Sequence, residues 1–221
     1  MLTRLRVRLP DRPGTLGRAA AALGTVGIDI HQIKALERAG GRAIIDLVVA
    51  LPAAMLPGAV ARYLAEIPGV RVEGCWQTGE SLDLDTDLEV IAEAVANPVR
   101  ALTTVIDAAP RFLHAHWAVA FEVGTGRLAH ASWRAPKITP PDLRSVRPRS
   151  LTAADGTRIA VAPIGADHVA LVGRRNAPPF HPAELHRLTR LADTAAGILA
   201  VHDSDTPLRH DLALVSDKRR G

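Results

Sequence analysis

The feature that most constrains the fold is the alternation of arginine and apolar residues near the start of the chain. Residues 4–9 read Arg-Leu-Arg-Val-Arg-Leu, and this period of two predicts a strand with Leu5, Val7 and Leu9 on a buried face. Two prolines and a glycine then break the strand within residues 10–14, and the apolar spacing that follows to Val26 is helical. A chain that opens in this way covers one face of a sheet with a helix.

The same pattern then recurs with a hairpin inserted. We predict strands over 28–36 and 43–51, joined by the glycine-rich turn at 39–41, then a helix over 56–67 and a strand over 70–76. The resulting order, βαββαβ, is typical of a ferredoxin-like domain, in which two helices cover one face of a four-stranded antiparallel sheet. We assign this domain to residues 1–77.

The other face of that sheet carries the residues that the buried stripe leaves out. They mix charged and apolar side chains: Arg4, Arg6, Arg8, Ile44, Asp46, Val48, Arg71 and Glu73. Such a face suits burial against a second copy or a second domain. It equally suits exposure to solvent, with cross-strand ion pairs such as Arg6 with Asp46 or Glu73. The sequence leaves both interpretations open.

The turn between the first strand and the first helix offers the chemistry of a ligand site. Gly14 allows a ligand to approach the backbone, and the amides of Gly14, Thr15 and Leu16 are expected to point out of a helix N-terminus, where a carboxylate is favoured. Asp29 begins the next strand and is expected to reach the same region. Asp29 or Asp11 would then hold an ammonium group, and the site would fit a free amino acid. The alternative is a turn in which Asp11 only caps the helix.

The joint pattern resembles a known family. A βαββαβ unit that opens with Asp11-Arg12-Pro13-Gly14-Thr15-Leu16 and continues through a helix to Gly27-Ile28-Asp29-Ile30 resembles the ACT domain over residues 1–77. The resemblance implies an amino-acid-sensing module that associates with further copies and binds its ligand at the interface. It also implies that the ligand-binding residues are Asp11, Arg12, Gly14, Thr15, Leu16 and Asp29.

A second domain is expected over residues 85–203, after a polar linker at 78–84 and before a flexible tail at 204–221. We predict two helices over 85–106, strands over 114–123 and 127–133, a proline-rich loop over 134–150, strands over 158–164 and 168–174, and a long closing helix from Phe180. The segment from Phe180 to Asp193 resembles the closing helix of GAF domains, which are also small-molecule sensors. The overall fold class is α+β, and a scaffold or dimerisation role is favoured for this domain over ligand binding.

Catalytic, metal and cofactor sites are not expected. The sequence has no Gly-x-Ser-x-Gly motif, no phosphate-binding loop and no dinucleotide fingerprint, so we expect a non-enzyme without cofactors. His114, His116 and His130 fall on paired strands, but no cysteine or acidic cluster accompanies them, which favours exposed strand residues over a metal site. Cys75 beside Trp76 is interpreted as a buried structural thiol.

Charge and hydropathy limit the binding partners and the cellular compartment that we expect for this chain. The formal charge is +4, but the arginines are scattered without aromatic interleaving, so nucleic-acid binding is not expected. The chain has one cysteine, no apolar run of about 18 residues and no apolar leader, which indicates a cytoplasmic protein without a membrane span.

These features together predict a regulatory protein that forms a homodimer, binds a free amino acid at the ACT-like domain and changes its domain or subunit arrangement. The alternative is a ligand-free interaction or dimerisation module, or a regulatory subunit that docks on an unidentified protein partner. A small enzyme with a His and Asp site invisible in sequence is a third hypothesis.

Overall fold

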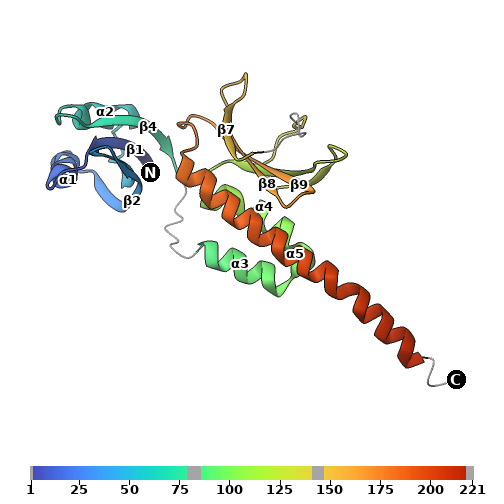
Figure 1. The fold of residues 1–221 in the computed structure, drawn as a ribbon. Coiled ribbons are helices and arrows are strands. Elements are labelled where there is room, and N and C mark those ends of the chain that lie inside the picture. Colours follow the sequence, from blue (N-terminus) through green and yellow to red (C-terminus); the bar gives the residue numbers. More distant parts are fainter. Residues whose placement is uncertain (1, 79–85, 141–146, 218–221) are drawn as a thin grey trace. The chain divides into compact units, whose positions relative to one another are not determined.

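The computed structural model describes residues 2–78, 86–140 and 147–217 and separates into two compact units (Figure 1). The first unit contains Met1–Asp83 together with two later segments, Thr152–Arg158 and Arg174–Ala183; the second contains the rest of the chain. Apart from Thr78, the predicted linker at 78–84 lies outside the described residues.

The first unit has the predicted βαββαβ order. Its sheet runs β2-β3-β1-β4 with every pairing antiparallel, as in a ferredoxin-like fold. The elements are β1 Leu2–Pro10, α1 Thr15–Thr25, β2 Asp29–Ala39, β3 Arg42–Ala50, α2 Pro57–Ala65 and β4 Arg71–Gln77.

Both helices of the first unit cover the same face of the sheet. The predicted stripe of Leu5, Val7 and Leu9 is buried in one core with Leu23 from α1 and Leu64 from α2. Because side chains alternate along a strand, Arg4, Arg6 and Arg8 point to the opposite face. The strand periodicity therefore divides this sheet into an apolar face under the helices and an arginine-rich face.

The second unit combines an antiparallel sheet with three α-helices. The sheet order is β6-β5-β9-β8-β7. The elements are α3 Thr86–Ala96, a short 3₁₀ helix Pro98–Arg100, α4 Ala101–Phe112, β5 Trp117–Glu122, β6 Leu128–Ala131, β7 Arg149–Thr152, β8 Arg158–Ile164, β9 His168–Arg174 and α5 Pro182–Asp217. The expected α+β fold class, with antiparallel sheets and flanking helices, is confirmed.

Strand β7 and helix α5 differ from the sequence prediction, and β5 begins at Trp117, so His114 and His116 precede the strand on which they were predicted. Strand β7 begins at Arg149, within the proline-rich segment that was predicted to be a loop, because its backbone pairs with β8 at the sheet edge. Helix α5 continues to Asp217 and so includes residues 204–217 of the segment predicted as a flexible tail.

The core of the second unit is built around Trp117. Its indole lies against Gly173 on the neighbouring strand β9, where the registered pair leaves room for the ring only because residue 173 has no side chain. Helix α5 is tied to α3 and α4 by Arg187, which donates hydrogen bonds to Asp87 at 2.6–3.0 Å and to the carbonyl of Phe112 at 2.6 Å. Hydrogen bonds from the Arg187 side chain therefore join the three helices.

Candidate ligand site

The turn before α1 has the open backbone that the sequence predicted. Gly14 adopts a left-handed conformation with φ of +83°, and no atom lies within 4 Å of the position that a Cβ would occupy there. Helix α1 begins at the next residue, Thr15, and no side chain caps it. A ligand can therefore approach the start of the helix along its axis.

The backbone amides at this helix start are only partly used by the protein. The Thr15 amide donates to the Arg12 carbonyl at 3.2 Å, so it is not available to a ligand as predicted. Among the described residues, no acceptor takes a hydrogen bond from the amides of Gly14, Leu16 or Gly17. The structure thus keeps two of the three predicted donors and adds Gly17, which the sequence analysis missed because only the pairing within the turn decides which amide is free.

The side chains of the predicted loop differ in their surroundings. Arg12 is exposed and Leu16 is 37% exposed, whereas Thr15 is on the buried side of α1. The Thr15 hydroxyl accepts a hydrogen bond of 3.5 Å from Arg18 one turn further along. A ligand at this turn would consequently meet Arg12 and Leu16, whereas the Thr15 side chain belongs to the protein interior.

Asp11 is held by an arginine rather than by the helix. Its two carboxylate oxygens accept hydrogen bonds from Arg38 at 2.9 and 3.1 Å, and the hydrogen bond with Asp11 raises the pKa of Arg38 above its ordinary value. The alternative role considered for Asp11, a cap on α1, is therefore not seen. With its charge matched by Arg38, Asp11 is poorly placed to hold a ligand ammonium group as well.

Asp29 lies at the opposite end of the sheet from the turn. The prediction that Asp29 and the turn of the same chain together hold one amino acid is therefore wrong. Asp29 pairs with Ala50, which also pairs with Leu2 at the start of β1, whereas Pro10 at the end of β1 pairs with Arg42. The two positions are eight residue steps apart along β1, which is about 26 Å at 3.3 Å per residue. Helix α1 carries the chain back along the sheet between the turn and Asp29. The Asp29 carboxylate is 81% exposed, with His31 at 3.6 Å.

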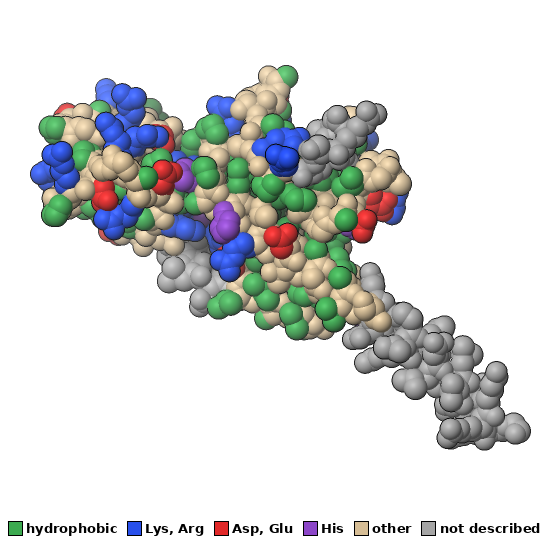
Figure 2. All heavy atoms as spheres, in the orientation of Figure 1, with side chains coloured by type: hydrophobic (Ala, Val, Ile, Leu, Met, Phe, Trp, Pro, Cys, Tyr) green, Lys and Arg blue, Asp and Glu red, His purple; other side chains and the backbone are tan. Residues whose placement is uncertain are grey.

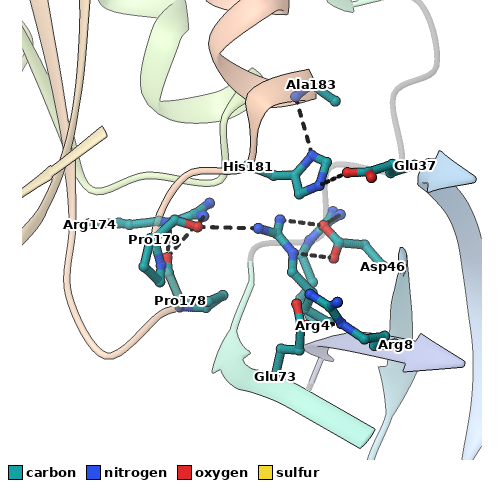
Figure 3. Close-up of polar contacts among 11 residues, drawn as sticks. Arg4, Arg8, Glu37, Asp46, Glu73, Arg174, Pro178, Pro179, His181 and Ala183 are labelled. Atoms are coloured by element: carbon teal, nitrogen blue, oxygen red, sulfur yellow. Dashed lines mark hydrogen bonds and ion pairs between the residues drawn. The ribbon is translucent and has the colours of Figure 1, made fainter. Parts of the chain in front are cut away.

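The arginine-rich face of the first sheet holds a buried ion-pair cluster (Figure 3). Arg6 donates two hydrogen bonds to Asp46, from Nε at 2.8 Å and Nη2 at 2.9 Å, and Arg4 lies 3.6 Å from the same carboxylate. All three side chains are only 2–3% exposed. The predicted cross-strand pair between Arg6 and Asp46 is confirmed, and it is buried rather than solvated.

The cover over this cluster is the segment Arg174–Ala183, which belongs to the first unit. Arg6 donates to the carbonyl of Pro179 at 3.3 Å, and His181 lies 3.0 Å from Glu37 on β2. The Arg174 guanidinium lies over the rings of Trp76 and Phe180, at 5.3 and 3.9 Å from their centroids. Local sequence patterns do not indicate this contact, because Pro179 lies 173 residues from Arg6 along the chain.

His130 and Cys75 each contact a group on another element of their unit. His130 lies 2.8 Å from Asp107 of α4, and Ser132 accepts a hydrogen bond from the Ala118 amide at 2.8 Å. Cys75 lies 3.4 Å from the Pro57 carbonyl, and burial raises the pKa of its thiol to about 11. Within the described part of the chain, no three His, Cys, Asp or Glu side chains converge as a metal site, and no helix is long and apolar enough to cross a membrane.

Comparisons with known proteins give structural likenesses alone. No family model matches the chain, and no curated protein matches it. The chain is similar to a GAF domain. That domain, from Pseudomonas syringae pv. tomato, is 14% identical, with 59% of this chain and 91% of that chain covered and a TM-score of 0.43.

Two further solved structures have lower scores. A formyltetrahydrofolate deformylase from Pseudomonas putida KT2440 is 16% identical over 44% of this chain and 39% of that chain, with a TM-score of 0.31. An unknown protein from Galdieria sulphuraria is 13% identical over 86% of this chain and 90% of that chain, also with a TM-score of 0.31. The ACT-like identity of residues 1–77 stays a prediction from their motif and element order.

Proposed function

We propose that this chain is a regulatory, non-catalytic protein that binds a free amino acid at the start of α1 and changes its domain or subunit arrangement in response. The observation that carries the proposal is the set of unused amides of Gly14, Leu16 and Gly17 at an uncapped helix N-terminus. These donors and the positive end of the helix dipole favour a carboxylate. The left-handed Gly14 leaves the approach to them open.

The ammonium group of the ligand needs a carboxylate that the same turn does not supply. Asp11 is matched by Arg38, and Asp29 of the same copy is at the far end of the sheet. Asp29 of a second copy is a suitable donor. Strand β2 is an edge of its sheet, and an antiparallel β2–β2 pairing centred between Ile33 and Lys34 would set Asp29 of one copy opposite Arg38 of the other.

Strand β2 has the properties of a pairing edge. It is 11 residues long and mostly exposed, and Ile33 near its middle is 47% exposed. A long edge strand of this kind presents unpaired N–H and C=O groups to another chain. Such a homodimer would form two amino-acid sites, each combining the turn of one copy with Asp29 of the other.

The chain offers a route by which a change in the first sheet could reach other elements. Segment Arg174–Ala183 contacts the sheet through Arg6 and Glu37, and it is the direct continuation of β9 and leads into α5. A ligand that changed the β2 edge would alter the environment of Glu37 and hence of His181. This connection supports a regulatory response rather than simple storage of a ligand.

The experiment is a thermal-shift screen of the full chain against the standard amino acids. A ligand that binds the folded state at 100 times its Kd stabilises it by about 2.7 kcal/mol, so the midpoint rises measurably. We expect one or a few amino acids to raise it at millimolar concentration. If no amino acid does so, the proposal fails.

The matched pair Gly17→Asp and Gly17→Ala localises the response. A Cβ at Gly17 meets nothing within 4 Å, and an acidic residue in the first turn of a helix is favourable, so both variants should fold. The aspartate competes with the ligand carboxylate for the free amides and should weaken binding at least tenfold, while the alanine variant should bind as the native chain does. Equal binding by both variants would move the site elsewhere.

The second candidate function is a ligand-free interaction or dimerisation module. The Asp11–Arg38 pair favours it, because the carboxylate of the turn is already satisfied without a ligand. This function predicts self-association through β2, or capture by a protein partner, with no midpoint shift from any amino acid. Sedimentation of the full chain with and without amino acids separates the two functions.

A further inference from the structure

A polar cavity lies at the end of the first sheet where β1 finishes and β3 and β4 begin. It has a volume of about 690 Å³ and is lined by Arg8, Arg42, Gly69, Val70, Arg71 and Glu73. This volume is in the range of small-molecule sites. Figure 2 shows that basic side chains are numerous on the visible face of the first unit.

The register of the sheet explains why three arginines meet there. Arg8 pairs directly with Arg71 on β4, and Pro10, two residues further along β1, pairs with Arg42 on β3. Residues two apart on a strand share a face, and neighbouring strands are about 4.8 Å apart, so the three side chains leave the sheet on one side within reach of a common point. Like charges directly opposite one another destabilise a sheet unless an anion accompanies them.

Among the residues that the structure describes, only one of the three guanidiniums has an anionic partner. Arg8 donates a hydrogen bond to Glu73 at 2.5 Å, and Figure 3 draws this pair. Arg42 and Arg71 are exposed, and no described residue forms a hydrogen bond or ion pair with either of them. The cavity thus presents two uncompensated positive charges beside one neutralised pair. Gly69 fixes its rim: φ is +79° there, and the glycine packs so closely on Pro10 that a Cβ would lie 2.8 Å from the proline ring.

We propose that this cavity binds the phosphate group of a small phosphorylated molecule. Guanidinium groups match phosphate oxygens in pairs of parallel hydrogen bonds. A phosphate monoester brings close to two negative charges at pH 7 in one group, which matches Arg42 and Arg71 together, whereas one carboxylate matches only one of them. The cavity is larger than a phosphate ion, so the remainder of the molecule would occupy the space over Val70. This site is separate from the proposed amino-acid site, and either could exist without the other.

Calorimetric titration of the full chain with inorganic pyrophosphate, at constant ionic strength, tests the proposal. We expect saturable binding that is tighter than binding of inorganic phosphate. The double variant Arg42→Gln/Arg71→Gln should weaken it at least tenfold. The matched control Arg62→Gln removes one positive charge from an exposed position of α2 in the same unit and should change the affinity less than twofold.

A variant that gains affinity excludes misfolding as the explanation. Glu73→Gln removes the negative charge and frees Arg8, so it should bind pyrophosphate several-fold more tightly than the native chain does. The proposal is overturned if pyrophosphate does not saturate or if Arg62→Gln weakens binding as much as the double variant. Tighter binding of citrate than of pyrophosphate overturns the phosphate assignment. Tighter binding of a single-stranded oligonucleotide, with equal loss in all arginine variants, would indicate a nucleic-acid surface instead.

Discussion

Arg6 and Asp46 form a two-pronged ion pair across strands β1 and β3, with N–O distances of 2.8 and 2.9 Å and almost no solvent exposure. Arg4 lies 3.6 Å from the same carboxylate, so one buried aspartate serves two buried arginines. Removing an ion from water is expensive, and its partner is what makes the burial tolerable. The middle of the arginine-rich face therefore depends on Asp46.

The first prediction is that Asp46→Asn strongly destabilises the first unit. The asparagine keeps the shape of the side chain but leaves Arg6 without its buried counter-charge, and breaking a buried pair in this way costs about 3–5 kcal/mol. Glu73→Gln, which breaks the more exposed pair with Arg8, should cost no more than about 1 kcal/mol. Urea denaturation of both variants gives the comparison; similar losses would contradict the special role of the buried pair.

The second prediction concerns the close contact between Gly74 and Pro178. A Cβ on Gly74 would lie 2.6 Å from the Pro178 Cδ, so Gly74→Ala must displace the segment Arg174–Ala183 from the sheet. We expect a loss of about 1–3 kcal/mol and a change in the fluorescence of Trp76, on which Arg174 stacks. Gly24→Ala in α1 is the control, because its Cβ meets nothing and alanine favours the helix. An unchanged Trp76 signal in Gly74→Ala would show that the segment does not pack there.

The sequence predicted the first unit closely because local patterns determine it. The alternation in residues 4–9, the Gly40-Gly41 hairpin turn and the helical stripes recur as β1, the β2–β3 turn and the two helices. The alternation also predicts Asp46 and Glu73 as possible partners of Arg6, and the register of β1 with β3 selects Asp46, since residues opposite in register share a face.

The failures of sequence reasoning involve distance along the chain. The packing of Pro179 on Arg6 joins residues 173 positions apart, and no local pattern encodes it. The position of Asp29 at the start of the next strand predicts that it reaches the turn, yet the 11 residues of α1 carry the chain back by about 16 Å. The Asp11–Arg38 pair joins residues 27 positions apart and depends on how β2 pairs with β3, so no local pattern indicates it.

The third prediction is that Cys75 reacts slowly with thiol reagents in the folded protein. Burial raises its pKa from 9.0 to about 11, so little thiolate is present at pH 8. Alkylation by iodoacetamide at pH 8 should be at least tenfold slower in buffer than in urea, and equal rates would contradict the burial. The pKa also sets a pH dependence. The folded protein holds the Cys75 proton more tightly than the unfolded chain does. The contribution of the protonated thiol to the free energy of unfolding is therefore fully present below pH 9 and is lost as the pH rises toward 11.

The fourth prediction follows from the separation of Asp29 from the turn within one copy. If an amino-acid site combines the turn of one copy with Asp29 of another, Asp29→Ala should abolish the midpoint shift without unfolding the chain, because this carboxylate is 81% exposed. The exposed Asp193→Ala in α5 is the matched control and should leave the shift unchanged.

Mixing two inactive variants then distinguishes a shared site from a single-copy site. Gly17→Asp disables the turn but keeps Asp29, and Asp29→Ala keeps the turn. In a mixed dimer, one of the two sites would combine the intact turn of the second variant with the intact Asp29 of the first. We therefore expect the unfolded and co-refolded mixture to recover binding at up to a quarter of the native number of sites, since about half of randomly formed dimers are mixed and each carries one intact site. A site contained in one copy cannot be restored in this way, because neither chain holds both functional parts. Absence of any recovery in a mixture shown to contain mixed dimers would therefore contradict a site shared between copies.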